Sequence, residues 1–155
     1  MDLEFIPEKN LKPVFADSVK IEQCLMNICL NSRDAMPNGG KITISTHNIL
    51  REDLGIEKRD KVSSDNLVMI ELKDSGEGIS EENLGKIFEP FFTTKDQGKG
   101  TGLGLSVVYG IIEQHHGFIH IESEIHKGTV IQIYLPRVDE IISISEKKII
   151  QPFNF

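Results

Sequence analysis

The sequence lacks any apolar run of about eighteen residues, the length that a membrane-spanning helix needs, and it has no charged and then apolar leader at its N-terminus. It also contains only 2 cysteines, Cys24 and Cys29, which are too few and too closely placed for a disulfide framework. We therefore expect a soluble, cytoplasmic domain that makes no membrane contact of its own.

Positive charge is also scarce, with 17 lysines and arginines against 24 aspartates and glutamates. The formal net charge of -7 argues against a general nucleic-acid-binding protein, although it leaves room for a local phosphate site. Hydrophobic residues at 39% and charged residues at 26% are ordinary values for a globular protein. A chain of 155 residues is long enough for one domain with a substantial core.

Alternation of apolar and polar residues, together with runs of β-branched residues, predicts the strands of this domain. The predicted strands are residues 3–6, 41–49, 67–72, 117–123 and 128–135. Apolar residues at helical spacing predict helices from Asp17 or Ser18 to just before Pro37 and at residues 103–116. A Ser80 cap followed by acidic residues in the first turn predicts a short helix at residues 80–87. Together these elements predict a mixed sheet with helices on one face.

Four segments fall outside this pattern. Residues 11–15 are either a second strand or an extended lead into the first helix. Residues 50–66 are rich in charge and are expected to form a solvated surface loop. Residues 88–101 are too irregular for a helix or strand, and residues 137–155 are either a small element or, as we favour, a tail or linker.

A run of alternating glycines precedes the last predicted helix, at Gly98, Gly100, Gly102 and Gly104. Glycine permits positive φ and lets a ligand approach the backbone closely. Amide groups at the start of a helix have no partners inside it and carry the positive end of its dipole, so a polyphosphate can bind there. The alternative is a flexible loop before an ordinary core helix.

Two further groups of residues favour a nucleotide site. Asp74 should lie at the end of a strand, facing a cavity, where its carboxylate can accept a hydrogen bond from an exocyclic amine, and Gly76 and Gly78 leave room for a flat ring. A plain Asp-Gly turn is the alternative. Asn27 and Asn31 project from one face of the predicted first helix, which is otherwise mostly apolar. Coordination of a Mg²⁺ ion that carries phosphate oxygens would explain two amides there.

Four blocks in this order resemble the N, G1, F and G2 boxes of sensor histidine kinases, within the superfamily of gyrase, heat-shock chaperones and mismatch-repair ATPases. The blocks are residues 27–35, Asp74-x-Gly-x-Gly78, Phe88-x-Pro-Phe-x-Thr-x-Lys95 and Gly98-x-Gly-x-Gly-Leu-Gly-Leu105. The resemblance covers roughly residues 17–136. It implies a two-layer α/β sandwich (α+β), with a mixed, mostly antiparallel sheet covered on one face by about three helices.

The resemblance also implies a role for each matched residue, with ATP and Mg²⁺ as the ligands. Asp74 would hold the adenine amino group, and the same end of the pocket would be lined by Gly76, Gly78, Ile79 and Thr129. Asn31 would bind Mg²⁺ with help from Asn27, while Arg33 or Asp34 could reach the nucleotide. Phe88, Phe91 and Phe92 would fix a mobile lid, and the phosphates would meet Thr94, Lys95, Gly98, Gly100, Thr101, Gly102, Leu103, Gly104 and Leu105.

One position separates the branches of this superfamily. The gyrase-like ATPases, the chaperones and the anti-sigma serine kinases have a general-base glutamate where this sequence has Asn27. An amide cannot take a proton at neutral pH, so the domain is expected to protect the γ-phosphate until a histidine arrives. The 5 histidines of the chain lack the acid and the Asn or Thr-Pro that mark a phosphoacceptor helix in this family.

The sequence therefore resembles the catalytic half of a sensor histidine kinase, with the catalytic domain at residues 1–136 and a tail at residues 137–155. The implied activity is transfer of the γ-phosphate of Mg-ATP to a histidine on a dimerisation and phosphoacceptor domain, with a response regulator downstream. The isolated domain is expected to be a monomer and can belong to the cytoplasmic part of a membrane-bound sensor. A self-sufficient ATPase clamp and a nucleotide-binding module that transfers nothing are the alternatives.

Overall fold

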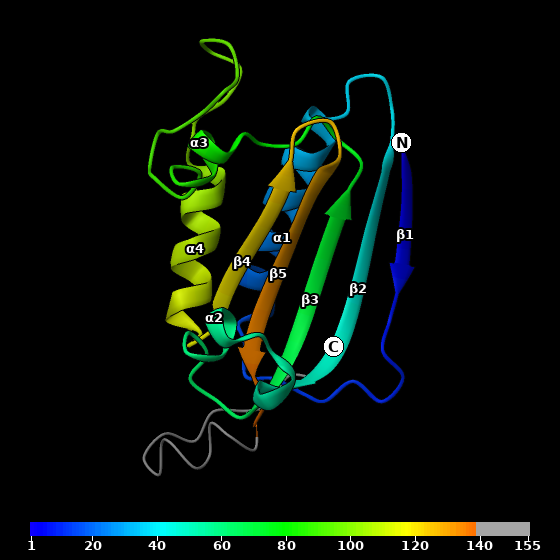
Figure 1. Cartoon of the computed structure of the whole chain (residues 1–155), viewed down its shortest axis with the longest axis vertical. Coiled ribbons are helices and arrows are strands. Elements are labelled where there is room, and N and C mark those ends of the chain that lie inside the picture. The colour runs from blue at the N-terminus through cyan, green and yellow to red at the C-terminus, as the bar shows by residue number, and fades with distance from the viewer. Residues whose placement is uncertain (139–155) are drawn as a thin grey trace.

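A computed structural model of the chain describes residues 1–138 and centres on one five-stranded sheet with the order β1-β2-β3-β5-β4 (Figure 1). The strands are β1 (Asp2–Ile6), β2 (Lys41–Leu50), β3 (Asn66–Asp74), β4 (Phe118–Glu124) and β5 (Gly128–Pro136). β1 and β2 run parallel, and every other neighbouring pair is antiparallel. The predicted mixed, mostly antiparallel sheet is confirmed.

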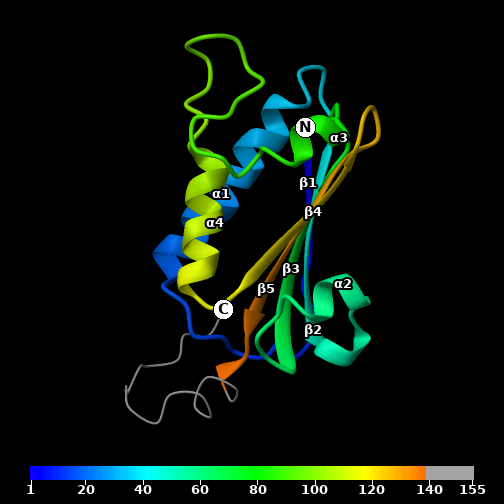
Figure 2. The ribbon, with the colours of Figure 1, turned by 60° about the vertical axis from the view of Figure 1, so that its left-hand side comes forward.

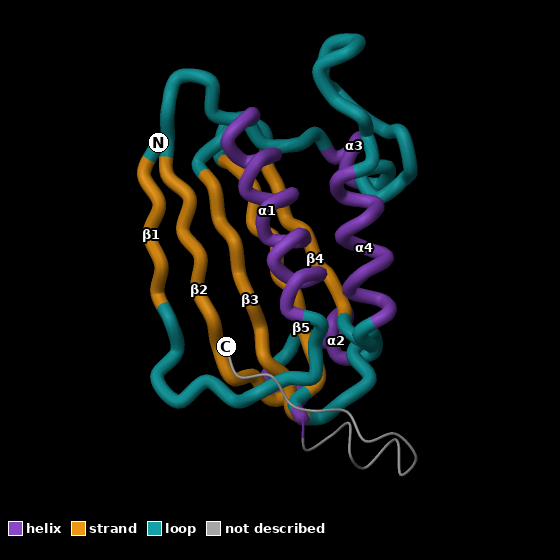
Figure 3. The backbone as a smooth tube through the Cα atoms, turned by 180° about the vertical axis from the view of Figure 1, so that it is seen from behind, coloured by secondary structure: helices purple, strands orange, loops and turns teal. Residues whose placement is uncertain are grey.

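Three helices cover one face of this sheet: α1 (Ser18–Asp34), α3 (Glu81–Leu84) and α4 (Gly104–Gln114) (Figure 2). α1 begins where the sequence predicts, because the Asp17 carboxylate accepts a hydrogen bond from Lys20 N at 3.3 Å. Seen from behind, α1 and α4 lie over the β3, β5 and β4 side of the sheet (Figure 3). The two-layer sandwich is therefore confirmed.

The main core fills the space between the sheet and the two long helices. It includes Ile21, Cys24 and Ile28 of α1, Val68, Ile70 and Leu72 of β3, Val108, Ile111 and Ile112 of α4, and Ile131, Ile133 and Leu135 of β5. Both cysteines are free thiols, as expected, and burial raises the pKa of the Cys24 thiol to about 11. Cys24 therefore acts as a small apolar core residue.

The prediction of a solvated loop at residues 50–66 is wrong in part. This segment forms a 3-10 turn, η1 (Arg51–Asp53), and a short helix, α2 (Ile56–Arg59), on the face of the sheet opposite α1 and α4 (Figure 2). Leu54 and Val62 are buried there in a second apolar cluster with Leu67, Met69 and Tyr134. The outer face of the sheet carries apolar side chains, and the segment covers them.

Residues 11–15 form an extended lead and no full strand. Val14 makes an isolated antiparallel bridge with Arg137, and Val138 N donates to Pro13 O at 3.1 Å. The predicted tail at residues 137–155 lies almost entirely outside the described residues. None of the helices within residues 1–138 combines the length and the apolar character that crossing a membrane requires.

Candidate functional site

The facing ends of α1 and α4 form the first part of the site. Asn27 Nδ2 donates to Gly104 O at 3.4 Å, and Asn31 Nδ2 lies 3.9 Å from the place that a Cβ on residue 104 would take. The two asparagines therefore share one face of α1, as predicted, and that face meets the start of α4. An alanine at position 104 would make only an ordinary contact with the Asn31 amide.

The start of α4 offers backbone donors beside these amides. α4 begins at Gly104, and the amides of its first turn have no acceptor inside the helix and carry its positive dipole end. Thr101 Oγ1 accepts from Leu103 N at 3.3 Å, so one donor ahead of the helix already has a partner. The structure therefore brings Gly104, the last glycine of the run, next to the asparagines of α1.

The second part of the site is the Asp74 cluster, formed by Asp74, Ser32, Gly76 and Thr129. Asp74 ends β3 and is only 7% exposed. Its Oδ1 accepts from Gly76 N at 2.9 Å and from Thr129 N at 3.1 Å, and its Oδ2 accepts from Ser32 Oγ at 2.6 Å. These bonds satisfy the buried carboxylate and leave Oδ2 one lone-pair direction for a ligand donor.

Ser32 is a site residue that sequence reasoning missed. It continues the buried stripe of α1 that holds Ile21, Cys24 and Ile28, so it faces the sheet. A hydroxyl on the core face of a helix needs a partner, because burying a polar group without one is costly. That spacing is the signal in the sequence that points to Ser32, although it does not say which acceptor Ser32 meets.

The hairpin between β4 and β5 closes the Asp74 cluster from the other side. Ser123 Oγ and Thr129 Oγ1 are 2.8 Å apart, and Ile79 N donates to Ser123 Oγ at 2.8 Å. Ile79 and Thr129, both predicted from the resemblance, therefore lie at the same end of the site as Asp74. Ser123 links the two and was not predicted.

Glycine is required at positions 76 and 78, close to Asp74, for a different reason from the one expected. Gly78 has a φ of 75°, and a Cβ there would lie 2.1 Å from Glu124 O. At Gly76 a Cβ would lie 2.9 Å from the Ala35 Cβ. The space beside both residues is filled by the protein itself, so the idea that their missing side chains make room for a flat ring is wrong. The glycines let the chain segments pack closely.

The lid, residues 89–101, projects beyond the start of α4 (Figure 1). Phe91 N donates to Gly102 O at 2.9 Å, and Gly102 has a φ of 68°. Phe91 is 75% exposed, so its ring does not fix the lid by packing, and within residues 1–138 its contribution at the base of the lid is this backbone hydrogen bond. Phe88 does pack, with its ring 5.2 Å from that of Tyr109.

Charged side chains connect the lid to the end of α1. Lys95 Nζ lies 2.6 Å from Asp34 Oδ2, and Arg33 donates to Asp34 Oδ1 from Nε at 3.0 Å and from Nη2 at 2.8 Å. The hydrogen bond from Lys95, followed by that from Arg33, lowers the pKa of the Asp34 carboxyl. Arg33, Asp34 and Lys95 thus meet one another, close to Asn31. Thr94, Gly98 and Gly100 lie within the projecting lid.

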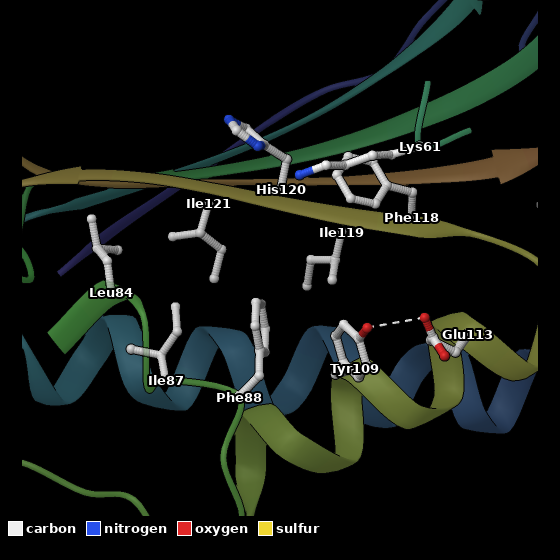
Figure 4. A pocket seen from close by; sticks show the side chains of 10 residues that line it. All are labelled: Lys61, Leu84, Ile87, Phe88, Tyr109, Glu113, Phe118, Ile119, His120 and Ile121. Carbon is white, nitrogen blue, oxygen red and sulfur yellow. Dashed lines mark hydrogen bonds between the residues drawn. The ribbon is translucent and has the colours of Figure 1, made fainter. Parts of the chain in front are cut away.

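A cavity of about 530 Å³ lies elsewhere, between α4 and the edge strand β4 (Figure 4). Ile119 and Ile121 of β4 point towards Ile87, Phe88 and Tyr109 across it. Phe88 is the only predicted site residue in its lining, and neither asparagine contributes to it. Size alone therefore does not locate the site that the motifs predict.

Comparison with known proteins identifies close relatives of this chain. The sensor kinase CckA of Brucella abortus strain 2308 is 47% identical over 157 residues, covering 96% of this chain and 16% of its own length. Sporulation kinase E of Bacillus subtilis strain 168 is 39% identical over 136 residues, covering 88% of this chain and 16% of its own length. The chain thus spans about a sixth of the length of both relatives.

Solved structures share the fold. The nucleotide-free catalytic domain of histidine kinase ThkA matches with a TM-score of 0.68 and 35% identity, over 88% of this chain and 78% of that one. Full-length ShkA in complex with AMPPNP matches with a TM-score of 0.68, over 88% of this chain and 25% of that one, and its 21% identity supports the fold alone. The model of the histidine kinase-, DNA gyrase B- and HSP90-like ATPases matches residues 16–139. On these grounds the chain belongs to that ATPase family, and within it to the catalytic domains of sensor histidine kinases.

Proposed function

We propose that this domain binds Mg-ATP and donates the γ-phosphate to a histidine on a separate dimerisation and phosphoacceptor domain. The proposal rests mainly on the way Asn27 and Asn31 face the first residues of α4, because phosphates bound at this helix start would meet two amide side chains and, at Asn27, no carboxylate that could act as a base. The names of the related sensor kinases support it.

The base end of the nucleotide fits the Asp74 cluster. A carboxylate accepts hydrogen bonds and cannot donate them, so the free lone-pair direction of Asp74 Oδ2 favours an exocyclic amine such as that of adenine over a carbonyl. Ile79, Gly76 and Gly78 would border the ring, with Thr129 behind Asp74. The three protein donors hold the carboxylate in place before any ligand arrives.

The phosphate end fits the start of α4 and the lid. Backbone amides from Gly100 to Leu105 would receive the phosphate oxygens, with Thr94 and Lys95 approaching from the lid. When bound, Mg²⁺ neutralises charge that develops on the transferred phosphoryl group. Asn31 suits this ion, since its amide has no hydrogen-bond partner within residues 1–138, and a carbonyl oxygen is a ligand that Mg²⁺ accepts.

Asn27 decides between hydrolysis and transfer. Its Nδ2 is already turned towards Gly104 O, which leaves Oδ1 for the metal or its waters, and the amide cannot remove a proton from water. A neutral imidazole needs no such help, because its attacking nitrogen carries no proton that must first be removed. In the transfer, this nitrogen bonds to the γ-phosphorus as the bond to the β,γ-bridging oxygen breaks, ADP leaves with the electron pair, and the other ring nitrogen releases its proton to water.

The acceptor histidine is proposed to lie outside residues 1–138. His115, for example, has a structural role: its Nε2 accepts from Asp17 N at 3.1 Å, and its Nδ1 lies 2.7 Å from Ile111 O. Both nitrogens are therefore engaged: Nε2 joins the end of α4 to the start of α1, and Nδ1 contacts a carbonyl of α4 itself. The acceptor domain and a downstream response regulator are the proposed partners, and the isolated catalytic domain is proposed to be a cytoplasmic monomer.

A transfer assay tests this proposal. The chain is mixed with a separately produced phosphoacceptor domain of a sensor histidine kinase and with ATP labelled on the γ-phosphate. An acid-labile, alkali-stable phosphoprotein is the expected product, and Asp74→Asn should reduce it. ATP binding without any labelled acceptor contradicts transfer. Steady release of phosphate by the chain alone, abolished by Asn27→Ala, indicates instead a self-sufficient ATPase.

A further inference from the structure

We propose that Asp34 is a positioning residue for Lys95: it holds the lid lysine beside the phosphate end of the site and releases it to the phosphates when nucleotide binds. This inference rests on the proposed function, because it assumes that phosphates bind at the start of α4. It assigns to Asp34 an action on the lid in place of the direct contact with nucleotide that the family resemblance implies.

The position of Asp34 on α1 carries the first step. Asp34 is the last residue of α1 and lies one helical turn beyond Asn31, on the side that faces α4 and the lid. Its carboxylate meets Lys95 Nζ at 2.6 Å. One turn of helix rises about 5.4 Å, so the lysine is kept within a short side-chain movement of Asn31.

The lid has no other such connection among the described residues. Thr93 Oγ1 accepts from Lys95 N at 3.1 Å, and Lys99 Nζ lies 3.4 Å from Asp96 Oδ2, but both contacts stay inside the lid. At its base the lid is joined by Phe91 N and Gly102 O. Within residues 1–138, Lys95 therefore makes the one hydrogen bond or ion pair by which residues 93–100 reach another element.

Asp34 can release Lys95 without being left unpaired. The Arg33 guanidinium occupies Oδ1 through two hydrogen bonds, and Lys95 occupies Oδ2 alone. When Lys95 moves to a phosphate, the carboxylate keeps its arginine partner. The lowered pKa of Asp34 agrees with this pair of cations and keeps the residue charged near neutral pH.

The ion pair between Lys95 and Asp34 is weak enough for Lys95 to exchange the carboxylate for a phosphate. The side chains of Lys95 and Asp34 are 33% and 32% exposed, so water and salt weaken their attraction. Exposed ion pairs of this kind typically change an equilibrium by about two- to fivefold. A polyphosphate carries several negative charges and can therefore displace a single carboxylate from the lysine.

Hydrogen exchange of the nucleotide-free chain tests the holding step. Asp34→Asn should speed amide exchange of residues 93–100 by about two- to fivefold. The matched control is Lys99→Gln, which also removes one charge but breaks only the contact with Asp96 inside the lid. An Asp34→Asn lid that exchanges no faster than the Lys99→Gln lid overturns the proposal.

Titration with Mg-ATP and with adenosine tests the release step. Asp34→Asn should tighten ATP by about two- to fivefold and leave adenosine unchanged. A general electrostatic effect of removing one negative charge would also appear in a Lys95→Gln background, whereas an effect that acts through Lys95 disappears there. Persistence of the gain in that background overturns the release step. Failure of the wild-type chain to bind ATP overturns the proposed function instead, and the exchange experiment without nucleotide still reports whether Asp34 holds the lid.

Discussion

The Asp74 cluster and the lid lie at the two ends of the same site and are built in opposite ways. Asp74 is 7% exposed and accepts three hydrogen bonds, from α1, from the loop after β3 and from β5. The interior of the lid reaches the rest of the described chain through one partly exposed ion pair. From this difference we expect the Asp74 end to be formed during folding and the lid to become ordered only when a ligand binds.

This difference has a thermodynamic consequence for a ligand. Groups that are already fixed lose little conformational freedom on binding, whereas a segment that becomes ordered loses more. Contacts with Asp74 should therefore add directly to affinity and selectivity. Contacts with the lid should add less affinity and should instead change how fast the site opens and closes.

Gly128→Ala should break the Asp74 end most severely. Gly128 has a φ of 104°, and a Cβ there would lie 2.0 Å from Asp74 O. Strain and overpacking together should lower the free energy of unfolding by about 2–5 kcal/mol, measured by urea denaturation. Gly110→Ala in α4 is the control, since a Cβ there meets nothing within 4 Å and should add about 0.5–1 kcal/mol. Equal effects of the two substitutions would contradict the packing argument.

Asp74→Asn should remove most of the selectivity at the same end. The amide nitrogen would face donors from Ser32, Gly76 or Thr129, so we expect ATP affinity to fall by about 100-fold and the free energy of unfolding to fall by about 1–3 kcal/mol. Calorimetric titration measures the first effect. Asp65→Asn is the control, because the Asp65 side chain is 81% exposed and contacts only Arg51 at 3.7 Å. Unchanged ATP affinity would show that Asp74 does not contact the base.

Gly102→Ala should damage the lid and leave the global fold nearly unchanged. A Cβ at residue 102 would lie 2.3 Å from the Phe91 carbonyl carbon, and the backbone has a positive φ. We expect ATP affinity to fall by about tenfold, which corresponds to about 1.4 kcal/mol. Gly98→Ala has a φ of 88° but no contact within 4 Å, so it tests strain without the clash. If Gly98→Ala weakens ATP binding as much as Gly102→Ala does, the clash with Phe91 is not the cause of the loss.

Ser32→Ala should produce a smaller loss at the Asp74 end. It removes the 2.6 Å hydrogen bond to Oδ2 and should lower both stability and ATP binding by about 1 kcal/mol, or about fivefold in affinity. Ser63→Ala is the comparison, because the Ser63 hydroxyl makes an exposed bond of 3.3 Å to His116 O. Equal ATP affinities of the two variants would remove Ser32 from the site.

The smallest effect concerns the charge state of Asp34. Its folded-state pKa is lowered by Lys95 and Arg33, so the ion pair contributes fully above the ordinary carboxyl pKa and is lost as pH falls through the lowered value. A carbon NMR titration of the Asp34 carboxyl should show the lowered midpoint. Lys95→Gln should raise that midpoint, and Lys99→Gln should not. A midpoint insensitive to Lys95 would show that the two side chains do not pair in solution.

Local patterns allowed much of this fold to be predicted from sequence. Helical spacing and the Asp17 cap indicate α1, and the same spacing places Asn27 and Asn31 on one face. These features depend on residues within a few positions of each other. Short-range spacing does not show that distant segments contribute to one site. That expectation comes from the resemblance of the four blocks, in their order, to the family.

Long-range contacts explain what the sequence did not reveal. The partner of Ser32 lies 42 residues away at Asp74, and the partner of Asp34 lies 61 residues away at Lys95. The true reason for Gly78 lies in the β4–β5 hairpin, and the cover over Met69 comes from residues 50–66. Each requires the packed arrangement of elements, because the neighbouring sequence can place Ser32 on the buried face of α1 but cannot name the distant partner of any of these residues.

Ser32 and Asp34 are only two residues apart, yet one reaches the carboxylate at the end of β3 and the other reaches the lid. The final turn of α1 therefore sets the spacing between the group that would receive a purine and the group that would receive its last phosphate. Inserting or deleting a single residue in that turn would rotate these two side chains by about 100° relative to the helix before it. If the proposed site is right, the pitch of α1 would therefore set the length of the ligand that this domain accepts.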